Sequence, residues 1–247
     1  MRRRLGRVGG LLGIVAVVLV TGFGVRSDAG VDPRAISPAA DTPSVRALRI
    51  MPLGSSSTVG AGSLGTAGFR WPLESLLARD GIAYDMVGSQ QSGPAAMPDR
   101  DHEGHGGWTM ARMQPLVAGW MARQRPDVVL LQVGTNDLIT GVPPAVVAQR
   151  LDTMLRTIRS TSTAGVIVAG VWAPLRSRLP ARAEYARLAA AVVARHRSAG
   201  EPVTFVDTST LLGPGDVADG LHPSAAGYRK IAAIWEREIR SFVTIRH

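Results

Sequence analysis

The residues Asp127-Val-Val-Leu-Leu-Gln-Val-Gly-Thr-Asn-Asp137 decide the fold. A nearly unbroken apolar run of strand length, 127–133, ends directly in the polar segment Gly-Thr-Asn-Asp. Such a run is typical of a parallel strand that is covered on both faces. The polar residues follow its carboxyl end, and open α/β sheets bind ligands at that edge. The sequence therefore predicts a buried strand that leads into a polar site.

Four more apolar runs have the length of strands, and longer amphipathic stretches separate them. The runs cover 45–53, 82–87, 165–171 and 202–206. Helices are expected over 143–160, over 182–197, and from about Ser224, a candidate N-cap, to Phe242. This alternation predicts an α/β fold, a three-layer α/β/α sandwich around a central, mostly parallel five-stranded sheet.

The N-terminus has the pattern of an export signal. Arg2–Arg4 precede the apolar stretch Leu11–Val25, and a polar stretch with several prolines follows. We therefore divide the chain into a signal peptide or N-terminal anchor (1–28), a linker (29–44) and one domain (45–247). Because the apolar part is shorter than the roughly 20 residues of a membrane span, a cleaved signal is favoured over an anchor. The expected location is secreted or extracytoplasmic, with membrane anchoring left open.

Charge and cysteine content exclude several classes of protein. The net charge is +9, but residues 1–34 hold six arginines against two aspartates, which leaves about +5 for the rest of the chain. The arginines after residue 34 are scattered and have few aromatic neighbours, so no nucleic-acid partner is expected. The chain has no cysteine, which excludes disulfides, a thiol nucleophile and a lipid-modified cysteine.

Four polar segments carry the side chains that could take part in catalysis. They are Gly54–Thr58, Gly104–Trp108, Gly134–Asp137 and Asp219–Pro223. Each segment alone has a plain structural explanation as a turn or a helix cap. Together they supply what ester hydrolysis needs: a hydroxyl, a base, a group that orients the base, and donors for an oxyanion.

Among the five histidines, His222 is the best candidate for the base. Asp219 lies three residues earlier, so its carboxylate can hold one imidazole nitrogen while the other faces Ser56. His102 and His105 lie in a glycine-bearing loop without a near serine partner. The oxyanion donors are expected to be the backbone N–H of Ser56, the backbone N–H of Gly107 and the side-chain amide of Asn136.

A second acidic cluster has two interpretations. Asp99, Asp101 and Glu103 have the composition of a metal or acid site, but alternating acidic residues in a polar loop are more often solvated or capping. We favour the second interpretation and expect neither a metal nor a cofactor.

The four segments resemble the sequence blocks of the SGNH (GDSL-like) hydrolases, which are named for a serine, a glycine, an asparagine and a histidine. The matching residues here are Ser56, Gly107, Asn136 and His222, and the resemblance runs from about Ala47 to Trp235. It implies a flavodoxin-like fold of this family and a Ser-His-Asp triad of Ser56, His222 and Asp219. Ser55 replaces the aspartate that usually precedes the nucleophile, which makes Ser55 the alternative to Ser56.

Within that family, residues 84–90 and 101–109 look most like the acetylxylan-esterase type of carbohydrate esterase. The resemblance implies a serine esterase that removes short acyl groups, foremost acetyl, from a polysaccharide or a small ester. With the N-terminal export pattern, we expect a secreted protein, and we expect it to be a monomer. A broad short-chain esterase or lipase remains an alternative, and so does a non-catalytic carbohydrate-binding protein on a degenerate scaffold. Trp108 either forms an apolar face for a sugar or acyl group or anchors its loop in the core.

Overall fold

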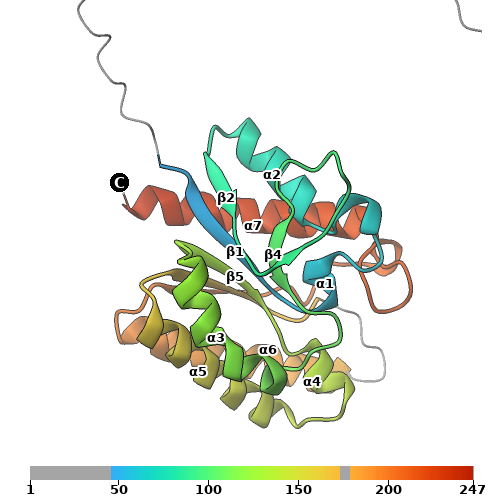
Figure 1. Ribbon diagram of the computed structural model, residues 1–247. Helices are drawn as coiled ribbons and strands as arrows, with labels where there is room; N and C mark the ends of the chain where they lie inside the picture. Colours follow the sequence, from blue (N-terminus) through green and yellow to red (C-terminus); the bar gives the residue numbers. More distant parts are fainter. Residues whose placement is uncertain (1–45, 173–178, 247) are drawn as a thin grey trace, which may run out of the picture. The chain divides into compact units, whose positions relative to one another are not determined.

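The structure, a computed structural model, describes residues 46–172 and 179–246 (Figure 1). The segments interpreted as signal or anchor (1–28) and as linker (29–44) lie outside the described residues. Within the described ranges, each helix is too short or too polar to cross a lipid bilayer.

Seven strands form one sheet in the order β3-β4-β1-β5-β6-β7, and β2 also pairs with β1. The strands are β1 (Leu48–Gly54), β2 (Tyr84–Met86), β3 (Gln90–Gln91), β4 (Asp101–Gly104), β5 (Val128–Gln132), β6 (Gly165–Ala169) and β7 (Val203–Val206). All pairings are parallel except that of β3 with β4. One edge of β1 pairs with β2 near its start and with β4 at its end, while β5 occupies the other edge.

The predicted three layers are present, because alternate strand residues enter two separate cores. On β5, Val129 and Leu131 pack with α3 (Met110–Gln124), α5 (Pro144–Thr161) and α6 (Leu179–Ser198). Val128 and Leu130 point the other way, toward α2 (Arg70–Arg79) and α7 (Ala225–Arg246). Figure 1 shows these two groups of helices on opposite faces of the sheet.

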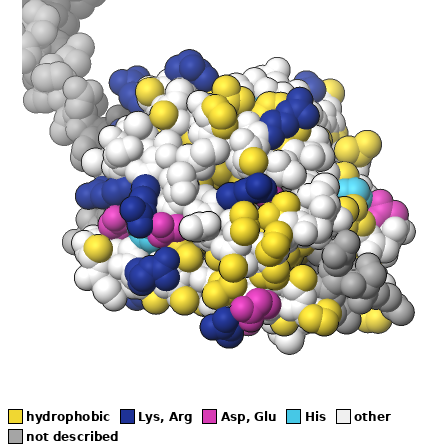
Figure 2. Space-filling view, turned by 90° about the horizontal axis from the view of Figure 1, so that it is seen from below, with side chains coloured by type: hydrophobic (Ala, Val, Ile, Leu, Met, Phe, Trp, Pro, Cys, Tyr) yellow, Lys and Arg dark blue, Asp and Glu magenta, His cyan; other side chains and the backbone are white. Residues whose placement is uncertain are grey.

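The shorter helices stand at the carboxyl ends of the strands or in the loops beside them. They are α1 (Ser56–Val59), η1 (Leu64–Thr66), α4 (Thr135–Ile139) and η3 (Pro214–Asp216). On the face viewed in Figure 2, the Lys and Arg side chains form separate groups among hydrophobic and other side chains, without a continuous basic surface.

The predicted number of five strands is wrong, because the polar sequences of β3 and β4 have the composition of loops. β4 reads Asp-His-Glu-Gly and has no apolar residue, so it lacks the pattern by which strands are recognised. It forms a strand because the buried side chains of His102 and Glu103 find hydrogen-bond partners in Ser92 and Ser89. Gly88 also contributes, since a Cβ at that position would overlap the backbone of His102. The other five strands and the three long helices predicted from the sequence are present, with ends shifted by a few residues.

The α2–α7 core depends on Trp235, which is 1% exposed and lies 6.0 Å from Phe69 and 6.5 Å from Trp172 between ring centroids. Trp235→Ala should lower the free energy of unfolding by about 3–5 kcal/mol, because the cavity cannot close fully between packed aromatic rings. Urea unfolding measures this loss. Trp235→Phe, which keeps one ring, should cost clearly less, and an equal cost for both variants would contradict this account of the core.

Candidate active site

The nucleophile candidate sits where β1 turns sharply into α1. β1 ends at Gly54, and Ser56 is the first helical residue. A Cβ on Gly54 would lie 2.5 Å from the carbonyl oxygen of Gln132 on β5, so glycine is what allows β1 to end this close to β5. The backbone N–H of Ser56 has no acceptor within its own helix, because it belongs to the first turn.

The structure distinguishes the three adjacent serines. Ser55 is 4% exposed and Ser57 is 8% exposed, and the indole N–H of Trp172 donates to Ser57 Oγ at 3.3 Å. Ser56 is half-buried, and its Oγ lies 3.0 Å from His222 Nε2. Of the three hydroxyls, that of Ser56 therefore has the geometry for activation by a base.

Asp219 holds His222 in the orientation that this contact needs. Asp219 Oδ2 lies 2.7 Å from His222 Nδ1, and Oδ1 accepts the backbone N–H groups of His222 and Leu221 at 2.7 and 3.0 Å. The backbone N–H of His222, followed by its side chain, lowers the pKa of Asp219 to about 2. The carboxylate is therefore charged at neutral pH, keeps a proton on Nδ1, and leaves Nε2 free to accept the proton of Ser56 Oγ.

The oxyanion candidates lie on the two sides of Ser56. β4, which leads to Gly107, pairs with one edge of β1, and β5, which leads to Asn136, pairs with the other. Gly107 occupies an exposed turn with a φ of 76°, a conformation that favours glycine. Asn136 Nδ2 donates to the carbonyl oxygen of Trp108 at 2.8 Å, which joins the two loops. A primary amide carries two N–H donors, so this bond uses only one of them.

Asp137, for which the sequence indicates only a turn, fixes the end of the loop that carries Gly107 and Trp108. It is fully buried, and its carboxylate accepts the backbone N–H of Met110 at 3.0 Å and Arg150 Nη1 at 2.6 Å. Because Met110 begins α3, Asp137 ties the start of this helix to the end of β5. Asn136 thus holds Trp108 in place, and the next residue, Asp137, holds the start of α3.

A buried arginine that the sequence analysis missed holds the helix of Ser56. The guanidinium of Arg70 is fully buried and donates to oxygens of Thr58, Val59, Ser92 and Arg100 at 3.0–3.2 Å. The oxygens of Thr58 and Val59 are the last carbonyls of α1 and need partners from outside the helix. Burial lowers the pKa of Arg70 to about 10, so the side chain remains charged at neutral pH. In the sequence, Arg70 has no feature that separates it from a surface arginine.

His102 does have a serine partner, contrary to the sequence analysis. Its Nε2 lies 2.7 Å from Ser92 Oγ, which also accepts Arg70, and its Nδ1 accepts the N–H of Gly104 at 2.9 Å. Burial, followed by the charge of Arg70, lowers the pKa of His102 to about 3, so the imidazole is neutral. The sequence does not indicate this contact, because Ser92 is ten residues before His102. The pairing of β3 with β4, which brings Ser92 close to His102, has no pattern in the sequence.

The acidic cluster acts as a set of hydrogen-bond acceptors. Glu103 is fully buried and accepts both the N–H and the hydroxyl of Ser89 at 2.7 Å. Asp99 accepts the backbone N–H groups of Met86 and Asp101. Within the described ranges, no group of three acidic or histidine side chains has metal-binding geometry.

The indole ring of Trp108 contacts both an imidazole ring and a guanidinium group. The ring of His105 stacks on it at 4.2 Å between centroids, and the guanidinium of Arg112 lies 4.3 Å from the ring centroid. His105 also stacks on Trp120 at 4.9 Å and lies 2.7 Å from Glu103 Oε1. Of the two interpretations of Trp108, these contacts favour the loop anchor over a free platform for a sugar ring.

The neutral, buried His102 should make stability depend on pH. Its pKa is about 3 in the folded protein and 6.5 in the reference state, so the folded state gains nothing from protonation above pH 3. As pH falls from about 6.5 toward 3, His102 binds a proton in the unfolded state but not in the folded state. The free energy of unfolding therefore falls by up to about 1.4 kcal/mol per pH unit. Urea unfolding of wild type and His102→Gln at pH 7, 6, 5 and 4 isolates this slope, since the other groups cancel in the difference. A pH-independent difference would contradict the assignment.

Comparisons with known proteins identify the family. The model of the GDSL-like lipase/acylhydrolase family matches residues 53–230. The chain is 27% identical over 229 residues to a multidomain esterase of Ruminococcus flavefaciens, covering 79% of this chain but only 29% of that protein's length. It is also 27% identical over 195 residues to esterase TesA of Pseudomonas aeruginosa, covering 78% of this chain and 89% of that one.

A solved structure agrees. A family 3 carbohydrate esterase of Clostridium thermocellum is 34% identical, with a TM-score of 0.72 over 78% of this chain and 94% of that chain. These matches confirm the resemblance to SGNH (GDSL-like) hydrolases drawn from the four polar segments. The chain therefore belongs to the GDSL-like lipase/acylhydrolase family and is a carboxylic ester hydrolase.

Proposed function

We propose that this protein is an exported serine esterase that removes acetyl groups from a polysaccharide through Ser56, His222 and Asp219. The hydrogen-bonded chain from Asp219 through His222 to Ser56 carries the proposal. The similarity to a family 3 carbohydrate esterase supports a carbohydrate ester as substrate. The preference for acetyl rests on the resemblance of residues 84–90 and 101–109 to the acetylxylan-esterase type, and export rests on the N-terminal pattern.

In the first half of the reaction, Ser56 Oγ attacks the ester carbonyl carbon and gives its proton to His222 Nε2. The N–H groups of Ser56 and Gly107 and the amide of Asn136 donate to the oxyanion that forms. The bond to the sugar oxygen then breaks, and His222 returns the proton to that oxygen. Acetyl remains on Ser56, and the sugar leaves with a free hydroxyl.

In the second half, His222 takes a proton from water as the water oxygen attacks the acetyl carbon. The same donors hold the second oxyanion, and the bond to Ser56 Oγ breaks. His222 returns the proton to Ser56, and acetate leaves. The charged Asp219 stabilises the imidazolium that exists in both halves.

Replacing the three serines one by one tests the nucleophile. Ser56→Ala should lower kcat at least about 10³-fold and abolish labelling by a fluorophosphonate, with unfolding free energy nearly unchanged. Ser55→Ala and Ser57→Ala are the matched controls and should keep both activity and labelling. If Ser55→Ala abolishes activity and Ser56→Ala does not, Ser55 is the nucleophile. A wild-type chain that hydrolyses no ester and takes no label would favour the non-catalytic alternative.

The acyl preference is tested with p-nitrophenyl esters of increasing chain length and with acetylated xylan. We expect kcat/KM to be highest for acetyl and to fall toward octanoyl, and acetate to be released from the glycan. Each methylene group changes binding in a tight pocket by about 1–3 kcal/mol, so affinity alone gives a graded fall and steric exclusion an abrupt one. A rate that rises with chain length, without acetate release, would support the lipase alternative.

A further inference from the structure

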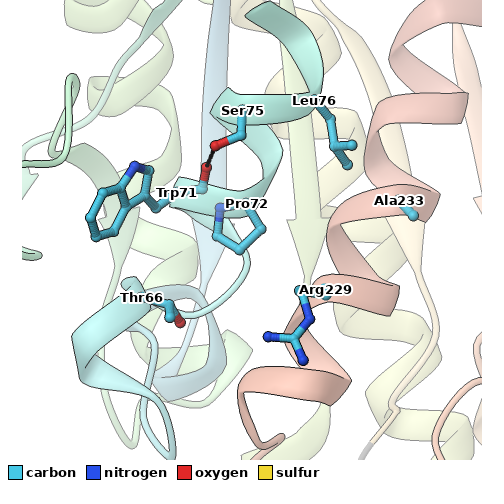
Figure 3. A pocket seen from close by; sticks show the side chains of 7 residues that line it. All are labelled: Thr66, Trp71, Pro72, Ser75, Leu76, Arg229 and Ala233. Atoms are coloured by element: carbon cyan, nitrogen blue, oxygen red, sulfur yellow. Dashed lines mark hydrogen bonds between the residues drawn. The ribbon is translucent and has the colours of Figure 1, made fainter. Parts of the chain in front are cut away.

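A hollow of about 420 Å³ lies between α2 and α7, on the side of η1 (Figure 3). It is lined by Thr66, Trp71, Pro72, Ser75, Leu76, Arg229 and Ala233. The volume is that of a site for a small ligand or one or two sugar units. Figure 3 shows Trp71 and Thr66 on one side of Pro72, and Leu76 and Ala233 on the other.

Trp71 gives this hollow an aromatic surface that other side chains leave open. The other four tryptophans have ring partners: Trp108 and Trp120 stack on His105, and Trp172 and Trp235 contact Phe69. In the described part of the chain, no aromatic ring or cation lies against Trp71, which is half-buried. With Pro72 it forms an apolar surface of the kind on which the C–H face of a pyranose packs.

Arg229 is the one charged residue of the lining. It is exposed, and no carboxylate of the described residues lies within ion-pair distance of it. An arginine without a carboxylate favours an anionic ligand, and its planar guanidinium matches a carboxylate. Ser75 donates its hydroxyl hydrogen to the carbonyl oxygen of Trp71 at 3.1 Å, so its lone pairs remain available to accept a sugar hydroxyl.

One segment, residues 60–68, separates this hollow from the candidate active site. Thr66 lines the hollow, while a Cβ on Gly62 would lie 2.8 Å from Cβ of His222. Tyr228, which precedes Arg229 on α7, donates its hydroxyl to the carbonyl oxygen of Ala61 at 2.7 Å. The hollow and the catalytic candidate His222 therefore border the same segment of the chain.

We propose that the hollow is an accessory subsite for a uronic-acid unit of an acylated polysaccharide. The pyranose ring packs on Trp71 and Pro72, and its carboxylate pairs with Arg229. This inference rests on the proposed esterase function and narrows its substrate to acidic glycans. An aryl carboxylic acid shares the same chemistry, a flat apolar body with a carboxylate, so the experiment includes both sources.

Calorimetric titration of the full chain with non-acetylated ligands tests the subsite without any turnover. The probes are xylotriose carrying one glucuronic acid, plain xylotriose and cinnamate. We expect saturable binding of the acidic oligosaccharide and at least about tenfold weaker binding of the neutral one. Arg229→Met should remove most of that difference and Trp71→Ala should weaken both oligosaccharides. Arg237→Met, an exposed arginine on the same helix outside the hollow, is the matched control and should bind as wild type.

Activity gives a second measurement. The ratio of kcat/KM on acidic to neutral acetylated xylan should fall at least several-fold in Arg229→Met and stay unchanged in Arg237→Met. Equal binding of both oligosaccharides, an unchanged titration for Arg229→Met, or binding of cinnamate alone would overturn the proposal. Because the titration needs no hydrolysis, its failure in an active enzyme rejects only the subsite. An inactive protein that still binds the acidic oligosaccharide rejects only the esterase mechanism.

Discussion

The parallel pairing of β1 with β4 on one edge and β5 on the other is the constraint on which the site depends. Gly54 at the end of β1 lies in register with Gly104 on one side and Gln132 on the other. Three loops therefore leave the sheet at the same level and carry Ser56, Gly107 and Asn136. Gly54 is needed there because a side chain would collide with the carbonyl of Gln132. Gly54 and Gln132, which are about 80 positions apart in the chain, become neighbours through strand register alone.

Buried polar groups then fix loops that apolar packing cannot fix. Arg70 holds the end of α1, and through Ser92 and His102 it connects the helix of Ser56 with β4. Asp137 holds the start of α3 on the other side. Burying Arg70, His102 or Asp137 without a hydrogen-bond partner would cost free energy. The loops that supply the partners are therefore held in the one arrangement that satisfies these side chains. Such a preformed arrangement is what an oxyanion site requires, because its donors must be in place before charge develops.

The glycans proposed as substrates extend beyond the one sugar unit that reacts at Ser56, so surfaces next to the site matter for selectivity. The segment 60–68 contacts His222 on one side and borders the hollow with Trp71 and Arg229 on the other. Trp108, by contrast, is enclosed by His105 and Arg112 and serves its own loop. Trp108, which lies in one of the four polar segments, is thus structural. Trp71, which belongs to no motif, lines the hollow and is open to a ligand.

The sequence by itself determined the layered α/β fold, the family, and the pairing of Asp219 with His222, because apolar periodicity and three-residue spacing are local properties. It could not reveal β3 and β4, whose residues are polar and form strands only through partners distant in the chain. It left Ser55 open beside Ser56 as the serine that faces the base, and it contained no sign that Arg70 is buried. Those outcomes depend on Trp172 reaching Ser57 across 115 positions and on carbonyls of α1 lying beside α2. Only the tertiary structure decides them, because a hydrogen bond between distant segments leaves no pattern in either segment.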